Sequence, residues 1–306
     1  MKVELKDVRS MILGHAVGDA LGVPVEFTRR ELLAKNPVKG MREFCSHNQP
    51  KGTWSDDTST ALCFMDAVVQ NNGGIVLQDI MQNFVKWVRN ADFTAGGKVF
   101  DVGNTTYEAI LNYSKYGCTP LNSGLDDFNS NGNGSLMRIA PTALYICAGK
   151  ADLRMADVIS SLTHAHEISK AGCRIYCAIV EGLFKGQDKS KAVENAIRVT
   201  NAPKEYHRLF DVASFCSLEN KEISSSGYVV DSLEAALWCF LTTNSYKNCL
   251  LKAVNLGRDT DTIGAIVGGI AGLYYREDSI PKEWLRVLKR RSYIKGLCEK
   301  FYNVLQ

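Results

Sequence analysis

The sequence lacks an excess of charge of either sign. Its 306 residues include 36 Lys and Arg against 33 Asp and Glu, which gives a formal net charge of +3. Neutralising a phosphate backbone requires a basic excess, so the composition excludes a dedicated nucleic-acid-binding protein. With 45% apolar and 23% charged residues, the chain has the composition of a globular protein and is neither disordered, collagen-like nor coiled-coil.

Cysteine motifs and long apolar runs are also missing. The ten cysteines are dispersed and include no Cys-x-x-Cys, which excludes a zinc ribbon and a redox pair. We expect them to be reduced and buried in a cytoplasmic protein. The charged stretch Met1 to Ser10 is unlike a signal peptide. The longest uncharged run near the end, Thr262 to Tyr275, is shorter than the roughly 20 residues of a membrane helix. No membrane partner is therefore expected.

Only seven prolines occur, and strand-like alternation of apolar and polar residues is scarce. Several prolines lie in expected loops, Thr28 to Trp54 and Cys118 to Ser135. Elsewhere, apolar residues recur at three- and four-residue spacing, which is typical of amphipathic helices. The expected helices include Asp57 to Val69, Ile80 to Val88, His166 to Leu183, Asp231 to Leu241 and Trp284 to Leu305. No linker or repeat divides the chain, so the sequence predicts an all-α bundle with residues 1–306 in one domain.

Two segments carry glycine at every fourth position. Gly14, Gly18 and Gly22 form one series, and residues 264, 268 and 272 form the other. Because each glycine inside a helix costs about 1 kcal/mol relative to alanine, a smooth helical face needs a compensating contact. We predict that these two helices pack closely at the centre of the bundle. In the alternative interpretation, the N-terminal segment is partly a loop.

Two acidic clusters precede expected helices. The first contains Ser55, Asp56 and Asp57, and the second contains Asp259 and Asp261. Each cluster can be read as an ordinary helix start, with a capping residue and acidic side chains near the macrodipole. The second helix is almost wholly apolar, however, so its start should be buried, and buried carboxylates need a positive charge nearby. Four carboxylates and several hydroxyls without cysteine favour Mg²⁺ or Mn²⁺ over zinc, and they suit two ions about 3.5–4 Å apart.

Seven ordered motifs resemble the ADP-ribosylglycohydrolase family. The matching segments are Gly14 to Phe27, Trp54 to Thr58, Phe100 to Thr106, Asn131 to Pro141, Thr163 to His164, Gly227 to Trp238 and Asn255 to Ala265. Each motif is weak alone, whereas the ordered set is specific. The resemblance implies an all-α orthogonal bundle, and it implies a site with two Mg²⁺ or Mn²⁺ ions. By motif position, the implied metal ligands are Ser55, Asp56, Asp57, Asp259, Asp261 and Thr262.

This chain departs from the family pattern at two positions. Ser55 stands where many relatives have threonine, a change that keeps the hydroxyl. Arg258 stands where glycine is common and adds a positive charge beside the metal motif.

The resemblance also implies residues for catalysis and substrate binding. Glu26, otherwise readable as a loop carboxylate, would activate or orient the attacking water. Asp101 and Asn104 match a motif that contacts the arginine side of the substrate, and a carboxylate suits a guanidinium chemically. Further implied contacts are Asn133, Gly134 and Ser135, in a glycine-rich loop before an apolar helix start at Leu136 to Ile139. His164 is implied to lie near the phosphates or distal ribose. Gly227 and Tyr228 are implied to lie near adenine. His166 is expected to be incidental.

The implied activity is metal-dependent hydrolysis that releases ADP-ribose from a modified protein, with ADP-ribosyl-arginine as the leading substrate. ADP-ribosyl-serine or a free ADP-ribose derivative is a second interpretation. A catalytically silent binding, immunity or structural relative is a third, although the intact carboxylates disfavour it. We expect a monomer whose partners are the ADP-ribosylated protein and the product ADP-ribose.

Overall fold

The computed structural model describes residues 2–306. Its helices are α1 (Leu5–Gly22), α2 (Arg30–Lys35), α3 (Asp56–Gln70), α4 (Leu77–Asn90), α5 (Asn104–Ser114), α6 (Ala140–Cys147), α7 (Arg154–Ser161), α8 (Glu167–Phe184), α9 (Lys189–Val199), α10 (Val212–Cys216), α11 (Val229–Leu241), α12 (Tyr246–Val254), α13 (Thr260–Tyr275), α14 (Lys282–Val287) and α15 (Arg291–Val304). Over these residues the chain forms no β-strand, only two isolated bridges. The predicted all-α fold is confirmed.

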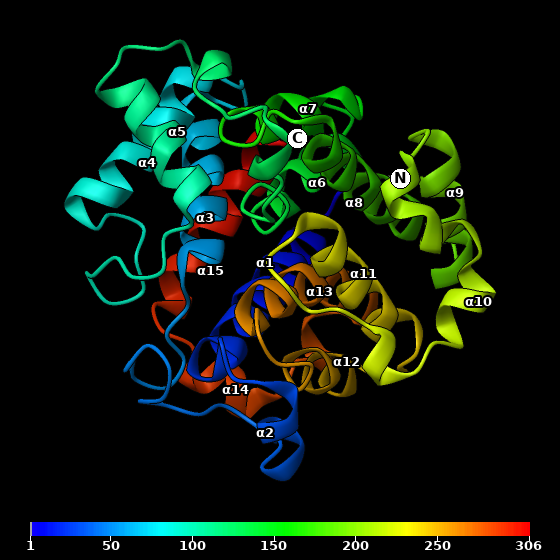
Figure 1. The fold of residues 1–306 in the computed structure, drawn as a ribbon. Coiled ribbons are helices and arrows are strands. Elements are labelled where there is room, and N and C mark those ends of the chain that lie inside the picture. Colours follow the sequence, from blue (N-terminus) through cyan, green and yellow to red (C-terminus); the bar gives the residue numbers. More distant parts are fainter. Residues whose placement is uncertain (1) are drawn as a thin grey trace.

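Helices α1 and α13 lie side by side at the centre of the bundle (Figure 1). A Cβ atom added at Gly18 would lie 2.5 Å from the carbonyl carbon of Gly264. A Cβ added at Gly14 would lie 2.9 Å from the Cα of Gly272. Only glycine permits this approach, so the packing offsets the low helix propensity of both segments. The predicted close contact is confirmed, and the N-terminal segment is helical throughout.

The other helices surround this pair. Helix α15 packs against α1 and α3, and α8 and α11 cover α13 (Figure 1). The core is continuous and includes the buried side chains of Trp54, Phe64 and Phe240. None of the helices found in residues 2–306 is both long enough and apolar enough to cross a membrane.

Three sequence expectations need local correction. The loop Thr28 to Trp54 contains α2, a helix too short for periodicity to reveal. The helix expected from Trp284 onward is divided into α14 and α15, because Leu288 leaves the helical conformation with a ψ of 121° and Arg290 adopts a left-handed φ of 48°. The helix expected at Leu136 begins only at Ala140, after a series of turns.

The cysteines also differ from expectation in part. All ten are free thiols, as predicted. Six are buried, but Cys45 is exposed and three others are half-buried. The exposed thiol lies in the loop before α3, where apolar periodicity provides no guide to burial.

Candidate active site

The two acidic clusters meet where α3 and α13 begin beside the end of α1. Asp19 of α1 accepts hydrogen bonds from the backbone nitrogens of Ser55 (2.9 Å) and Thr58 (3.0 Å). The Thr58 hydroxyl donates to the same carboxylate at 2.6 Å. Carboxylate oxygens of Asp19, Asp57 and Asp261 lie within 4.8 Å of one another. The close packing of α1 and α13 therefore converts two clusters about 200 residues apart into one site.

Capping of a helix start explains only part of what these clusters do. Ser55 is the N-cap of α3, and its Oγ accepts from the backbone nitrogen of Asp57 at 3.4 Å. Asp259 is the N-cap residue of α13 but makes no capping hydrogen bond through its side chain. Its Oδ2 instead accepts from Asn133 Nδ2 at 2.7 Å. Capping thus accounts for Ser55 and leaves the carboxylates of the second cluster unexplained.

The buried carboxylates are short of positive charge and of hydrogen-bond donors. Asp57 Oδ1 and Asp261 Oδ2 are buried without any partner among the described residues. Burial raises the pKa of Asp261 well above its usual range, and the charges of Glu26 and Asp57 raise it further. Burial and the neighbouring Asp57 do the same to the pKa of Asp56. An unpaired buried carboxylate is expensive, so this arrangement calls for cations.

Glu26 lies beside this cluster in the turn that follows η1 (Val23–Val25). Burial, followed by the charges of Asp101 and Asp259, raises the pKa of Glu26 to about 10. Its Oε2 contacts Nε2 of His47, and ligand atoms of Glu26, His47, Asp101 and Asp261 lie within 4.8 Å of one another. The predicted catalytic glutamate therefore shares its environment with one predicted metal ligand.

His47 and Asp19 are site residues that the sequence did not single out. The His47 ring lies 5.7 Å from the ring of Phe27 and 5.3 Å from that of Phe100, measured between centroids. These contacts hold the imidazole against Glu26. His47 lies in a loop, where the sequence has no apolar periodicity to indicate its position. Asp19 lies within the matching segment Gly14 to Phe27, and its position on the glycine-lined helix was the available clue.

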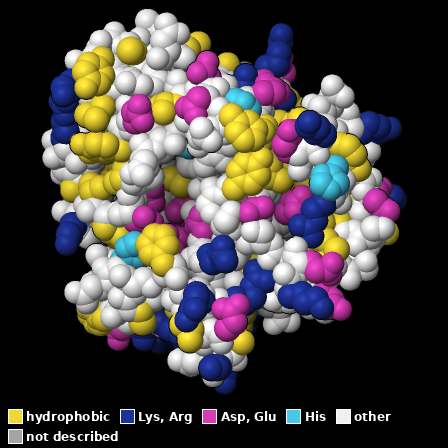
Figure 2. Space-filling model, viewed as in Figure 1, with side chains coloured by type: hydrophobic (Ala, Val, Ile, Leu, Met, Phe, Trp, Pro, Cys, Tyr) yellow, Lys and Arg dark blue, Asp and Glu magenta, His cyan; other side chains and the backbone are white. Residues whose placement is uncertain are grey.

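A cavity of about 250 Å³ lies beside Glu26. Its lining includes Glu26, Asp56, Asp101, Asn104, Asn133, Gly134, His164, Gly227, Asp259 and Thr262. Figure 2 shows acidic side chains gathered in a hollow left of centre on the face seen in Figure 1. Most residues predicted for substrate binding thus surround the same space as Glu26 and part of the acidic cluster.

Ser135 and Tyr228 are not part of this lining. The Ser135 hydroxyl is buried and accepts from Ser160 Oγ at 2.9 Å, so its side chain stabilises the loop from inside. Tyr228 is half-buried and precedes α11, and its backbone forms a bridge with Gly132.

The glycine-rich loop is held against His164. A Cβ at Gly134 would lie 2.8 Å from His164 Cε1, so glycine is required for the close approach. Burial lowers the pKa of His164 to about 3, and the charge of Arg138 acts in the same direction. Thr163 Oγ1 accepts from Arg138 at 2.8 Å and lies 2.7 Å from His164 Nδ1. This favours a neutral imidazole that receives the threonine hydrogen and presents Nε2–H as a donor to the cavity.

His166 has a structural role. Its Nδ1 lies 2.9 Å from Asn131 Nδ2 and accepts from the backbone nitrogen of Ile168 at the start of α8. It is therefore an N-cap that anchors the loop from outside the cavity.

Comparison with known proteins agrees with this geometry. The family model described as ADP-ribosylglycohydrolase matches residues 2–306. The chain is 33% identical to ADP-ribosylarginine hydrolase Tri1 of Serratia proteamaculans, over 97% of this chain and 79% of that protein. It is 32% identical to ADP-ribosyl-[dinitrogen reductase] glycohydrolase of Rhodospirillum rubrum, over 90% of this chain and 88% of the relative.

A solved structure shares the fold over the whole length. It is an ADP-ribosylglycohydrolase-related protein complex that superposes with a TM-score of 0.84 at 29% identity, covering 99% of both chains. The ordered motifs, the helical bundle with its acidic cavity, and the full-length matches agree, and the chain belongs to the ADP-ribosylglycohydrolase family.

Proposed function

We propose that this chain removes ADP-ribose from modified arginine side chains of proteins with the help of two Mg²⁺ or Mn²⁺ ions. The observation that carries the proposal is one cavity that contains both Glu26 and Asp101 above a buried acidic cluster. The relatives named as ADP-ribosylarginine hydrolases support arginine as the modified residue.

The donor set fits hard cations. Carboxylate and hydroxyl oxygens are the ligands that Mg²⁺ and Mn²⁺ prefer, and two buried carboxylate oxygens have no other partner in the described chain. Ser55, Asp56, Asp57, Asp259, Asp261 and Thr262 would hold the ions. When bound, the two ions would neutralise these carboxylates and bind the hydroxyls of the distal ribose.

Glu26 and Asp101 would act on opposite sides of the bond that breaks. Glu26 orients the attacking water and accepts its proton once the surrounding negative charge is compensated. The water oxygen bonds to the anomeric carbon of the distal ribose, while the bond from that carbon to the guanidinium nitrogen breaks. The neutral guanidine that departs takes up the proton that water gave to Glu26 and leaves as guanidinium. Asp101, half-buried at the cavity, holds the departing guanidinium through its carboxylate, assisted by Asn104.

The rest of the cavity would hold the ADP part. His164 can donate from Nε2 to a phosphate or ribose oxygen, and the backbone of Asn133 and Gly134 borders the same space. Gly227 lies next to Asp259, since a Cβ there would meet Asp259 Oδ2 at 3.3 Å. Tyr228 stays our candidate for stacking on adenine, and Ser135 supports the loop. The substrate would be an ADP-ribosylated protein, the product free ADP-ribose, and the enzyme a monomer.

The test measures ADP-ribose release from arginine-modified and serine-modified proteins, with Mg²⁺, with Mn²⁺ and with EDTA. We expect metal-dependent release from arginine. Faster release from serine would reassign the acceptor. No release from either, by protein with bound metal, would overturn the enzymatic proposal in favour of a silent relative. Asp261→Ala should abolish both metal binding and turnover, and retained activity would refute the ligand assignment.

A further inference from the structure

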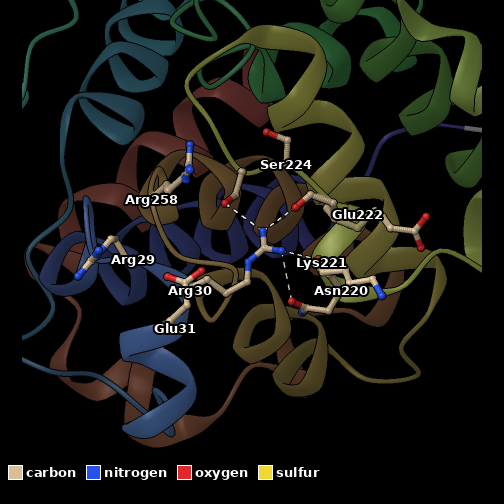
Figure 3. Close-up of a pocket in the computed structure, with 10 residues that line it drawn as sticks. Arg29, Arg30, Glu31, Asn220, Lys221, Glu222, Ser224 and Arg258 are labelled. Atoms are coloured by element: carbon tan, nitrogen blue, oxygen red, sulfur yellow. Dashed lines mark hydrogen bonds between the residues drawn. The ribbon is translucent and has the colours of Figure 1, made fainter.

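A second, larger hollow adjoins the catalytic cavity and is rich in basic side chains. It measures about 680 Å³ and is formed by the start of α2, the segment 220–225 and Arg258. Figure 3 shows the side chains that line it, including Arg29, Arg30, Lys221 and Arg258. Four cations face two carboxylates in this hollow, so its net charge is positive.

Three of these six charged side chains already have partners within the protein. Arg30 donates from Nη2 to the Ile223 carbonyl at 2.6 Å, which joins the walls of the hollow (Figure 3). Its Nε donates to the Leu256 carbonyl at 2.7 Å. Lys221 is ion-paired with Glu219 at 2.8 Å. Glu222 accepts from the backbone nitrogen of Glu219 at 2.7 Å, so its carboxylate closes its own turn.

Arg29 and Arg258 are the two cations left available. Both are exposed, and neither guanidinium makes an ion pair or hydrogen bond within residues 2–306. Burial lowers the pKa of Arg30, the charge of Glu31 acts against this shift, and the charge of Arg258 adds a smaller contribution in the direction of burial. Within residues 2–306 the hollow thus holds two unpaired guanidinium groups, Arg29 and Arg258, against one unpaired carboxylate, Glu31, and this surplus of positive charge favours a further anion.

Arg258 also links this hollow to the catalytic cavity. Its backbone nitrogen donates to the Thr28 carbonyl at 2.8 Å, and its carbonyl accepts from the Phe27 nitrogen at 2.6 Å. The backbone has a left-handed φ of 63° at this position. Arg258 is therefore held between the turn that carries Glu26 and the cavity residue Asp259. A protein segment whose modified side chain enters the cavity would place its neighbouring residues near Arg258.

We propose that Arg29 and Arg258 form a docking site for an acidic segment of the modified protein, with Asp or Glu within a few residues of the modified side chain. A guanidinium binds a carboxylate through two parallel hydrogen bonds, and both arginines have all their donors free. The proposal rests on the proposed function, because it assumes that an ADP-ribosylated protein segment enters the cavity. It makes these arginines determinants of protein choice rather than of chemistry.

The experiment compares two peptides of equal length, each ADP-ribosylated on one central arginine. One carries Glu on both sides of that arginine and the other carries Gln, and free ADP-ribosyl-arginine is the third substrate. The test variant is Arg29→Gln with Arg258→Gln. A control variant, Arg154→Gln with Arg198→Gln, removes the same charge from α7 and α9, where each arginine binds a residue close to it in sequence.

For the wild-type protein we expect a KM about fivefold lower on the Glu peptide than on the Gln peptide, as two exposed charge pairs allow. The preference should shrink at high salt. The test variant should lose the preference for the Glu peptide without a change in kcat, and the control variant should keep that preference. Turnover of free ADP-ribosyl-arginine should be unaffected in both variants.

Two results would overturn the proposal. One is an equal KM for both peptides in the wild type. The other is a KM for free ADP-ribosyl-arginine that rises with the test variant, which would assign the arginines to ADP-ribose itself. If no substrate turns over, the proposed function fails separately. Fluorescence anisotropy of labelled, unmodified Glu and Gln peptides then tests docking alone, and equal affinities would reject it.

Discussion

At the scale of single residues, the site is costly to fold without its ions. Asp261 is fully buried, has one oxygen without a partner, and has a raised pKa because of burial and of its carboxylate neighbours. Folding the metal-free chain must therefore protonate or desolvate this group, and either step destabilises the folded state. We propose the same side chain as a metal ligand, so its charge should become favourable once cations bind.

Asp261→Asn separates these two effects. It removes the buried charge while keeping the size of the side chain, so we expect the metal-free protein to gain about 1 kcal/mol or more in free energy of unfolding. Mn²⁺ binding and turnover should be lost. Chemical denaturation in EDTA, titration calorimetry with Mn²⁺ and the release assay measure the three quantities. A loss of stability without metal would contradict our view of this carboxylate.

Glu26 and His47 can be distinguished by a matched pair of variants. Glu26→Gln should lower kcat about 10²–10⁴-fold, because the amide cannot accept a proton from water. Mn²⁺ affinity should change little, since Glu26 is not among our proposed ligands. His47→Gln keeps a polar group beside Glu26 but loses the packing against Phe27 and Phe100, so we expect a smaller fall in kcat, about tenfold. A larger effect for His47 would show that the imidazole acts on the substrate directly.

At the scale of helices, glycine spacing positions the site. The contact between α1 and α13 lets Asp19 and Asp261 approach, and it leaves no room for a side chain at the crossing. A methyl group at Gly18 would overlap the backbone of α13. A helix could relieve this overlap only by moving away, which would separate the carboxylates.

We therefore expect Gly18→Ala to destabilise the protein by about 1–3 kcal/mol or more and to weaken metal binding. Gly296→Ala is the control, because Gly296 lies inside α15 and an added Cβ would meet nothing within 4 Å. That substitution should stabilise the protein by up to about 1 kcal/mol through helix propensity. Thermal unfolding of both variants measures the difference. Equal effects would mean that the glycine contact is not tight.

The helices and their contacts show which features of the site the sequence can predict and why it cannot predict the others. Spacing of glycines predicted the α1–α13 contact because only close packing offsets their cost. The second acidic cluster, which precedes an almost wholly apolar helix, predicted buried carboxylates that need a positive charge nearby. His47 and Asp19 were not found, since their roles depend on which loop or helix lies opposite them. The break between α14 and α15 depends on the non-helical Leu288 and the left-handed Arg290, and neither position carries a proline or glycine signal.

At the scale of the whole molecule, the nearly balanced charge is unevenly distributed. The net charge of +3 conceals an acidic cluster buried at the catalytic cavity and a basic hollow beside it. Arg258 lines the basic hollow and is joined by backbone hydrogen bonds to Thr28 and to Phe27, which lines the catalytic cavity. Opposite potentials in adjacent hollows would bind cations in one and an acidic partner at the other.

The buried carboxylates should make the free energy of unfolding of the metal-free protein depend on pH, and bound metal should reduce this dependence. Burial raises the pKa of Asp19 to about 7 and that of Glu26 to about 10, and it raises those of Asp56, Asp57 and Asp261 as well. Between pH 7 and 8 the unfolded carboxylates have lost their protons, whereas the folded ones retain some. The folded state thus binds more protons, and the free energy of unfolding must fall as pH rises.

Histidines do not oppose this trend in the same window. Burial lowers the pKa of His15 to about 4 and that of His164 to about 3, so both are neutral when folded, and unfolded histidine is mostly neutral above pH 7. We expect a loss of about 1–3 kcal/mol per pH unit in EDTA, given about 1.4 kcal/mol for each retained proton. Saturating Mg²⁺ should reduce this slope, because the proposed ligands Asp56, Asp57 and Asp261 are then ionised throughout. Urea denaturation at pH 7 and 8, with EDTA or Mg²⁺, measures it. A flat profile in EDTA would mean that the carboxylates are already paired with positive charge in the metal-free protein.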